Sequence, residues 1–154
     1  SGYHIMQGYW NLPEATAETM RNGWIHTGDM GYFDSGGFLF LVDRKRDVII
    51  SGAFNIYPKE IEDVIAAHPK VKEAAVIGVP DEKWGEAVKA IVVPKSGETV
   101  TEQQIIDFCR DHMASFKKPK SVDVVGELPR NPYGKVLKTV LRERYWKGYD
   151  RRIH

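Results

Sequence analysis

The sequence predicts an α+β fold in which two helices pack on a small sheet of three strands. Two nearly unbroken apolar runs, 72–79 and 86–93, and a shorter run at 121–125 have the length and composition of buried strands. Two amphipathic helical patterns accompany them, beginning near Pro58 and Thr101. At 154 residues, the chain is long enough to bury one core of this kind.

The first third of the chain is expected to form short extended pieces and one short helix. Residues 14–22 fit a helix that ends at Gly23. Two extended runs, 31–33 and 38–42, flank the sequence DSGG, which is a strong hairpin turn signal. We therefore expect the strands around 31–50 to form hairpins at the border between two domains.

The helical patterns carry local start signals. Pro58 suits a first helical position, because its missing N–H would have no partner there. Thr101 and Gln104 are spaced as a capping box. A third, basic amphipathic helix is expected over 136–146. The residues expected on the core sides of the first two helices are Ile61, Val64, Ile65 and His68, and then Ile105, Phe108, Cys109 and His112.

Composition excludes several classes of site. Acidic and basic residues nearly cancel, with a formal charge of +1, so a surface that binds polyanions globally is not expected. The single cysteine, Cys109, excludes an internal disulfide framework and a multi-cysteine metal site, and its apolar setting predicts a buried, reduced thiol. No apolar run reaches the length of a membrane span, and no leader-like segment opens the sequence. We expect a cytoplasmic protein without metal ligands in this chain.

Three stretches hold the groups that point to chemistry. Residues 43–62, DRKRDVIISGAFNIYPKEIE, combine a basic entrance with two short extended pieces and a helix start. Residues 24–29, WIHTGD, place a carboxylate beside a glycine, and an ionised carboxylate can accept hydrogen bonds from both hydroxyls of a diol. Residues 128–135, LPRNPYGK, form a proline-stiffened loop that presents a lysine. Taken singly, each stretch is also compatible with a solvated surface turn.

Together and in this order, the three stretches resemble the signatures of the adenylate-forming enzymes, the superfamily of acyl-CoA synthetases, luciferases and peptide-synthetase adenylation domains. The form ISG followed by NIYP is similar to the acyl-CoA synthetase version of the motif. The resemblance covers nearly the whole chain. It implies an ATP-dependent acid–CoA ligase that activates a carboxylate as acyl-AMP and transfers the acyl group to CoA. It also implies Mg²⁺, whose ligands are expected outside this chain.

The resemblance implies roles for individual residues. Lys135 matches the adenylation lysine, a cation placed where negative charge develops in the transition state. Asp29 and Arg44 match residues that bind the nucleotide, and Arg46 matches the hinge between the two domains of the family. The residues expected at the CoA site are Ser51, Gly52, Lys117 and Lys118.

The same resemblance divides the chain in two. Residues 1–43 are expected to be the tail of a large N-terminal AMP-binding domain, and residues 44–154 the mobile C-terminal domain. The phosphate loop and the acyl pocket are expected upstream, so this chain alone is predicted to be inactive. Ala53 departs from the glycine that relatives commonly have, and an added Cβ would be awkward there if the backbone needed a positive φ.

Two other readings of the sequence remain open. A freestanding module of the same fold would bind an adenine nucleotide or a partner subunit without ligase activity. A basic scaffold would bind nucleic acid through residues 116–120 and the last helix. The near-zero net charge and the separation of the aromatic from the basic residues disfavour the nucleic-acid reading.

Overall fold

The structure is a computed structural model that describes residues 2–149, and the chain divides into two compact units after Arg46. Unit 1 ends at Arg46 and unit 2 begins at Asp47. Each unit has its own sheets and is described separately.

Unit 1 consists of one helix and two separate hairpins. Its elements are α1 (Pro13–Thr19), β1 (Met20–Arg21), β2 (Trp24–Ile25), β3 (Asp29–Phe33) and β4 (Leu39–Arg44). The helix expected over 14–22 ends at Thr19, because Asn22 and Gly23 both adopt positive φ, 53° and 77°, and join β1 to β2. An Asn-Gly pair in this conformation is the preferred two-residue hairpin turn.

The second hairpin confirms the turn expected at the sequence DSGG. The Asp34 carboxylate accepts hydrogen bonds from the N–H groups of Gly36 and Phe38, both at 2.9 Å. Strands β3 and β4 pair antiparallel on either side of this turn, and Tyr32 stacks on Phe40 with ring centroids 5.4 Å apart. Both rings remain exposed to solvent.

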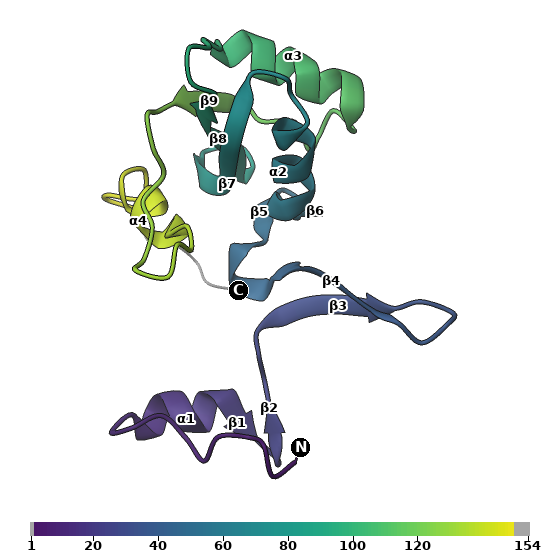
Figure 1. Ribbon diagram of the computed structural model, residues 1–154, viewed down its shortest axis with the longest axis vertical. Coiled ribbons are helices and arrows are strands. Elements are labelled where there is room, and N and C mark those ends of the chain that lie inside the picture. Colours follow the sequence, from purple (N-terminus) through teal and green to yellow (C-terminus); the bar gives the residue numbers. More distant parts are fainter. Residues whose placement is uncertain (1, 150–154) are drawn as a thin grey trace. The chain divides into compact units, whose positions relative to one another are not determined.

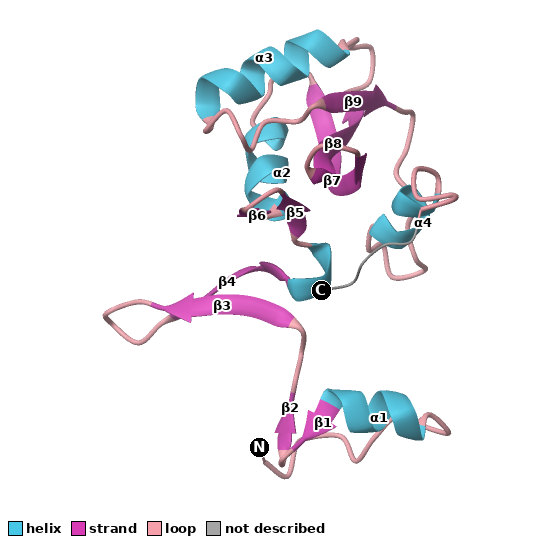
Figure 2. Cartoon of the chain, turned by 180° about the vertical axis from the view of Figure 1, so that it is seen from behind, coloured by secondary structure: helices cyan, strands magenta, loops and turns pink. Residues whose placement is uncertain are grey.

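Unit 2 is built on one mixed sheet. Its strands are β5 (Ile49–Ser51), β6 (Phe54–Ile56), β7 (Val71–Asp81), β8 (Gly85–Pro94) and β9 (Ser121–Val124). The three expected strands are present as β7, β8 and β9, so the α+β prediction is confirmed. The sheet has five strands instead of three, because Ser51 pairs with Gly85 and attaches the β5–β6 hairpin to β8. Strand β9 pairs parallel with β8. Figure 2 shows β9 beside β8 and next to α3 (Glu102–His112).

Strand β7 extends beyond the expected run 72–79 and continues through Pro80 and Asp81. Pro80 pairs with Glu86, and Asp81 pairs with Gly85, before the chain turns. An edge strand tolerates proline, because the N–H that proline lacks can face away from the neighbouring strand. Strand β7 is the last strand in the sheet order, which explains the longer strand.

The helices of unit 2 cover both faces of the sheet. Helices α2 (Pro58–Ala66) and α4 (Lys138–Glu143) lie on opposite sides of β7 and β8 in Figure 1, and α3 (Glu102–His112) packs with α2. The core under α2 and α3 includes Ile49, Ile61, Ile65, Val76, Val92, Ile105 and Cys109. The core on the α4 face includes Ala75, Ile77, Ile91, Val93, Leu128 and Leu141.

Helix α3 confirms the predicted capping box. The Gln104 N–H donates to Thr101 Oγ1, and the Thr101 N–H donates to Gln104 Oε1. Cys109 is fully buried, as predicted, and burial raises the pKa of its thiol to about 11. His112, expected on the core side, is instead exposed at the helix end, where its ring stacks on Phe108.

The last helix is shorter than the 136–146 expected. Val136 forms a β-bridge with Arg130, which removes it from the helix, and α4 ends at Glu143. A short 3₁₀ helix, Lys45–Asp47, contains the division between the units. Within residues 2–149, no helix has the length and apolar character that crossing a membrane requires.

Candidate functional site

The structure brings Asp29 and Arg44 together. They are paired residues on β3 and β4, and Arg44 Nε lies 3.1 Å from Asp29 Oδ1. A tight turn precedes Asp29, since Gly28 has a φ of 76° and its carbonyl accepts the Lys45 N–H at 2.8 Å. The carboxylate keeps a free face for further donors, because one oxygen meets the arginine and its side chain is 29% exposed. The two predicted nucleotide-binding residues thus form one charged, accessible pair.

The predicted hinge residue lies where unit 1 ends. Arg46 is exposed within the 3₁₀ helix, and the residue that follows it, Asp47, is buried in unit 2. A hinge needs a few residues at the end of an element that absorb changes in φ and ψ. The position of Arg46 meets that description, and its role as hinge stays a prediction.

The β5–β6 turn has a specific backbone geometry at Gly52. The φ of Gly52 is 60°, its N–H donates to the Trp84 carbonyl at 2.7 Å, and a Cβ there would lie 2.8 Å from Trp84 Cε3. Gly52 is therefore required by both backbone conformation and space. Ala53 has a negative φ, so its Cβ creates no backbone strain and the departure from glycine is tolerated here.

A pocket of about 230 Å³ joins the turn to the segment after α3. Its lining includes Ser51, Phe54, Trp84, Phe116, Lys118 and Lys120. Phe54 stacks on Phe116 with centroids 4.5 Å apart, which holds two segments together that are distant in sequence. Ser51 and Lys118, both predicted at the CoA site, therefore share one pocket.

The lysines around this pocket differ in their partners. Lys117 Nζ lies 2.7 Å from Glu60 Oε1, so its charge is neutralised within the fold. Lys120 pairs with Asp81 at 2.5 Å, and this hydrogen bond lowers the pKa of the Asp81 carboxyl. No ion pair involves Lys118 among the described residues. Lys118 is thus better placed than Lys117 to meet an anionic ligand.

A larger hollow of about 500 Å³ lies on the other side of Trp84. Its lining includes Gly52, Asp81, Glu82, Glu86, Trp146 and Tyr149. None of the described residues that line this hollow is a lysine or an arginine, and Glu82 and Glu86 add negative charge to it. The smaller, lysine-lined pocket is therefore the better site for a phosphate-bearing ligand. Trp84 lines both hollows, and the sequence analysis missed it. The available signal was a tryptophan in the polar turn after Asp81.

Lys135 ends a loop that is braced by its own side chains. Asn131 Oδ1 accepts the N–H groups of Tyr133 and Lys135, at 3.0 and 2.9 Å, and Arg130 Nη1 donates to the Gly134 carbonyl at 2.5 Å. Arg130 also forms an ion pair with Glu73 on β7. The Lys135 side chain is exposed. The loop therefore presents a cation to solvent on a rigid support, as the proline-rich sequence predicted.

The described residues contain no cluster of three or more His, Cys, Asp or Glu side chains that is able to hold a metal ion.

Comparison with known proteins assigns the chain to a family. Residues 60–135 match the AMP-binding enzyme C-terminal domain. The chain is 54% identical to a long-chain-fatty-acid–CoA ligase of Mycobacterium tuberculosis, over 92% of this chain and 28% of that ligase. It is 51% identical to a 2-succinylbenzoate–CoA ligase of Bacillus cereus, over 92% of this chain and 29% of that ligase.

The solved structures agree with the sequence matches. The crystal structure of ATP-bound MatB from Rhodopseudomonas palustris superposes with a TM-score of 0.87 at 45% identity, covering 97% of this chain and 30% of that one. The chain thus spans less than a third of the length of the relatives it matches.

Proposed function

The chain belongs to the adenylate-forming enzymes as their C-terminal portion, and on that premise we propose that the full-length protein is an ATP-dependent acid–CoA ligase. It activates a carboxylic acid as acyl-AMP with release of pyrophosphate, and it then transfers the acyl group to the CoA thiol with release of AMP. Two relatives named as acid–CoA ligases, each at least 51% identical, support this assignment. A cytoplasmic location belongs to the same proposal, in keeping with the unpaired Cys109.

We assign residues 1–43 to the large N-terminal domain and residues 44–154 to the mobile C-terminal domain. The division between compact units after Arg46 supports a boundary in this region. The chain alone is expected to show no acid-dependent ATP–pyrophosphate exchange, because the missing part of the ligase supplies the phosphate loop and the acyl pocket. Measurable exchange by the purified chain would contradict this part of the proposal.

The observation that carries the proposed mechanism is the braced, exposed Lys135. Attack of a carboxylate on the α-phosphate of ATP brings two anions together, and negative charge grows on the oxygens around phosphorus. A lysine ammonium on a rigid loop stabilises that charge with little reorganisation. Asn131 and Arg130 hold the loop in shape before the substrates bind. Lys135 therefore acts on adenylate formation.

Asp29 and Arg44 bind the nucleotide in this scheme. The Asp29 carboxylate accepts the ribose hydroxyls, and Arg44, 3.1 Å away, orients the carboxylate and contributes a permanent positive charge. After the chain pivots at Arg46, the 51–55 turn and the pocket that contains Ser51 and Lys118 face CoA. The lysine-lined pocket supports this assignment, because CoA carries phosphates that need a cation.

The test is Lys135→Ala in the full-length ligase, with the two half-reactions measured separately. We expect acyl-adenylate formation to slow by about two to three orders of magnitude, as for the loss of one transition-state contact. Thioester formation from preformed acyl-adenylate and CoA stays near the parent rate.

The matched control is Lys72→Ala, which removes another exposed lysine, located on β7 and outside the loop. Both half-reactions of this variant should equal those of the parent. A Lys135→Ala variant whose adenylation rate stays within a few-fold of the parent rate would show that the lysine only decorates the loop.

A further inference from the structure

Three charged residues are buried among those that the structure describes: Asp47, Lys89 and Arg142. Two of them pair with each other, since Arg142 Nη2 lies 2.8 Å from Asp47 Oδ1. Their side chains are only 7% and 13% exposed. The pair joins the first residue of unit 2 to its last helix.

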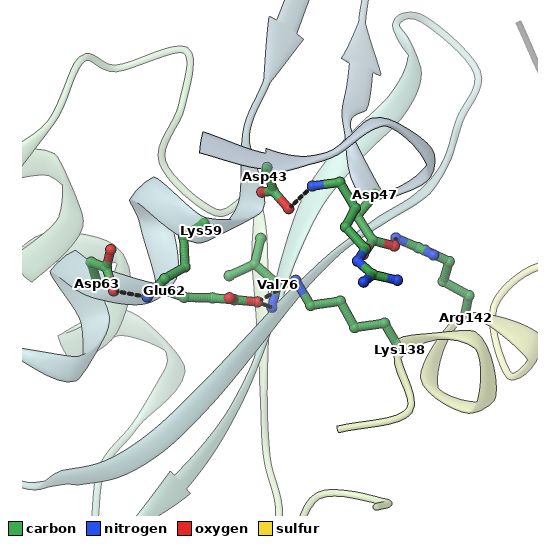
Figure 3. Close-up of polar contacts among 9 residues, drawn as sticks. Asp43, Asp47, Lys59, Glu62, Asp63, Val76, Lys138 and Arg142 are labelled. Atoms are coloured by element: carbon green, nitrogen blue, oxygen red, sulfur yellow. Dashed lines mark hydrogen bonds and ion pairs between the residues drawn. The ribbon is translucent and has the colours of Figure 1, made fainter. Parts of the chain in front are cut away.

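A second ion pair holds the same helix. Lys138 Nζ lies 2.7 Å from Glu62 Oε1, and the same oxygen accepts the Val76 N–H at 2.8 Å. Lys138 and Arg142 are four residues apart, so they share one face of α4. Figure 3 shows the two side chains extending from α4, one toward Glu62 and the other toward Asp47.

Helix α4 depends on such contacts for its position. It has only six residues, and its N-cap residue, Leu137, makes no side-chain capping bond. An isolated helix of this length does not form in water. Besides the two ion pairs, α4 is anchored by Leu141, which is buried in the core on that face of the sheet. The Lys135 loop leads directly into α4, and the Leu137 N–H donates to the Pro129 carbonyl at 2.8 Å across the base of the loop.

The chemistry of the buried pair indicates that it positions α4 more than it stabilises the fold. Arginine keeps its charge when buried, and Arg142 Nε has no hydrogen-bond partner among the described residues. Apolar residues of similar volume often replace a buried ion pair without loss of stability. A charged hydrogen bond fixes both the distance and the orientation of the two groups that it joins. Two apolar side chains in contact do not impose such a fixed orientation.

We propose that Asp47 and Arg142 are positioning residues, which hold α4 and the Lys135 loop in a fixed geometry relative to the segment that follows Arg46. The inference rests on the proposed function. When the chain pivots at Arg46, the pair makes the Lys135 loop move together with Asp47, so that the ammonium arrives at a defined place. Without the pair, unit 2 still folds, but the Lys135 ammonium is positioned less accurately relative to the substrates.

The test is the double variant Asp47→Leu, Arg142→Met in the full-length ligase. We expect acyl-adenylate formation to slow by at least about tenfold, because an error of about 1 Å in placing a catalytic group reduces rates by up to 10²-fold. The KM for ATP and the rate of thioester formation from preformed acyl-adenylate stay within about threefold of the parent values. The melting temperature stays within a few degrees, which separates positioning from a structural role.

The control is Lys89→Met, which removes the third buried charge. Lys89 pairs with the more exposed Asp123 at 2.6 Å and lies over the Tyr145 ring, and among the described residues no ion pair joins it to Asp47 or Arg142. Its adenylation rate should stay within about threefold of the parent rate. Should the double variant not fold, Arg142→Lys keeps a charge at this position while removing the planar guanidinium that fixes the geometry of the pair, and the ratio of the two half-reaction rates then decides.

Two outcomes would overturn the inference: an adenylation rate within threefold of the parent, or an equal loss of both half-reactions. Lys135→Ala, measured in the same series, separates this failure from failure of the proposed function. If Lys135→Ala slows adenylation and the double variant does not, only the positioning inference is wrong. If Lys135→Ala also has no effect, the proposed role of Lys135 is wrong.

Discussion

Unit 1 and unit 2 hold their structures by different means. Residues 2–46 form hairpins and a short helix in which no residue is buried, whereas every buried residue lies in 47–149. Unit 2 packs helices on both faces of its sheet and so contains two apolar cores. Turn hydrogen bonds and local pairing define unit 1, and burial stabilises unit 2. Hydrogen-bonded pairing between two strands defines a local conformation that is only marginally stable in water. The burial of apolar side chains in unit 2 provides the main driving force for cooperative folding.

The surface of unit 1 is correspondingly apolar. Its most exposed large side chains include Trp10, at 88%, Phe33 and Phe38, both at 70%, and Leu41, at 68%. Large apolar side chains exposed in this number on one short segment are typical of a surface that another part of a protein covers. We expect these side chains to pack against the remainder of the large N-terminal domain in the proposed ligase.

Separating the two units should produce the largest effect. We expect residues 47–154 alone to unfold in one cooperative thermal transition, and residues 1–46 alone to show none, because a hairpin without a core is marginal in water. Circular dichroism during heating measures both. A cooperative transition in the 1–46 peptide would mean that unit 1 does not depend on a partner surface.

A smaller effect should follow from truncating one side chain in each unit. Ile65, at 0% exposure, lies in the core under α2, so Ile65→Ala should destabilise the chain by about 2–5 kcal/mol. Leu41→Ala is the matched change in unit 1, where we expect about 0.5 kcal/mol or less. Urea denaturation of the chain, followed by tryptophan fluorescence, gives both values. Similar losses at the two sites would contradict the contrast between the units.

The smallest effect should come from single hydroxyl groups. Thr101→Ala removes the α3 cap and should destabilise unit 2 by about 1 kcal/mol, a shift in melting temperature of roughly 4–8 °C. In unit 1, Thr16 accepts the Tyr9 N–H and donates to the Leu12 carbonyl, both bonds being exposed. Thr16→Ala should leave the main transition unchanged. A calorimetric scan of both variants checks this difference.

The features predicted correctly from sequence are those with local causes. The apolar runs correctly predicted β7 and β8, and the spacing of Thr101 and Gln104 correctly predicted the capping box of α3. The errors also have local causes. The prediction of a helix over 14–22 did not take into account that Asn22-Gly23 is a hairpin turn signal. The prediction of a strand over 72–79 stopped before Pro80, although a strand at the edge of a sheet tolerates proline.

Contacts between distant segments were not predictable in the same way. No local sequence pattern predicts which lysine forms an ion pair, because the partner can be distant in sequence. Lys117, for example, pairs with Glu60, which is 57 residues away. Trp84 reaches the Gly52 turn only because Ser51 pairs with Gly85. At the nucleotide site the prediction was more direct, since Asp29 and Arg44 lie on the two strands of one hairpin. Their binding roles, and that of Lys135, stay predictions until the half-reactions are measured.

The Asp47–Arg142 contact also bears on the order in which unit 2 assembles. It joins residues 95 positions apart, so forming it closes a long loop, and loop closure reduces chain entropy before the contact can contribute. We therefore expect short-range structure such as the β7–β8 hairpin to form first and α4 to dock late. An interaction that is absent from the folding transition state acts mainly on the rate of unfolding. Removing only one member of the pair, which leaves the other charge buried without a partner, should therefore speed unfolding of unit 2 while the folding rate stays nearly the same.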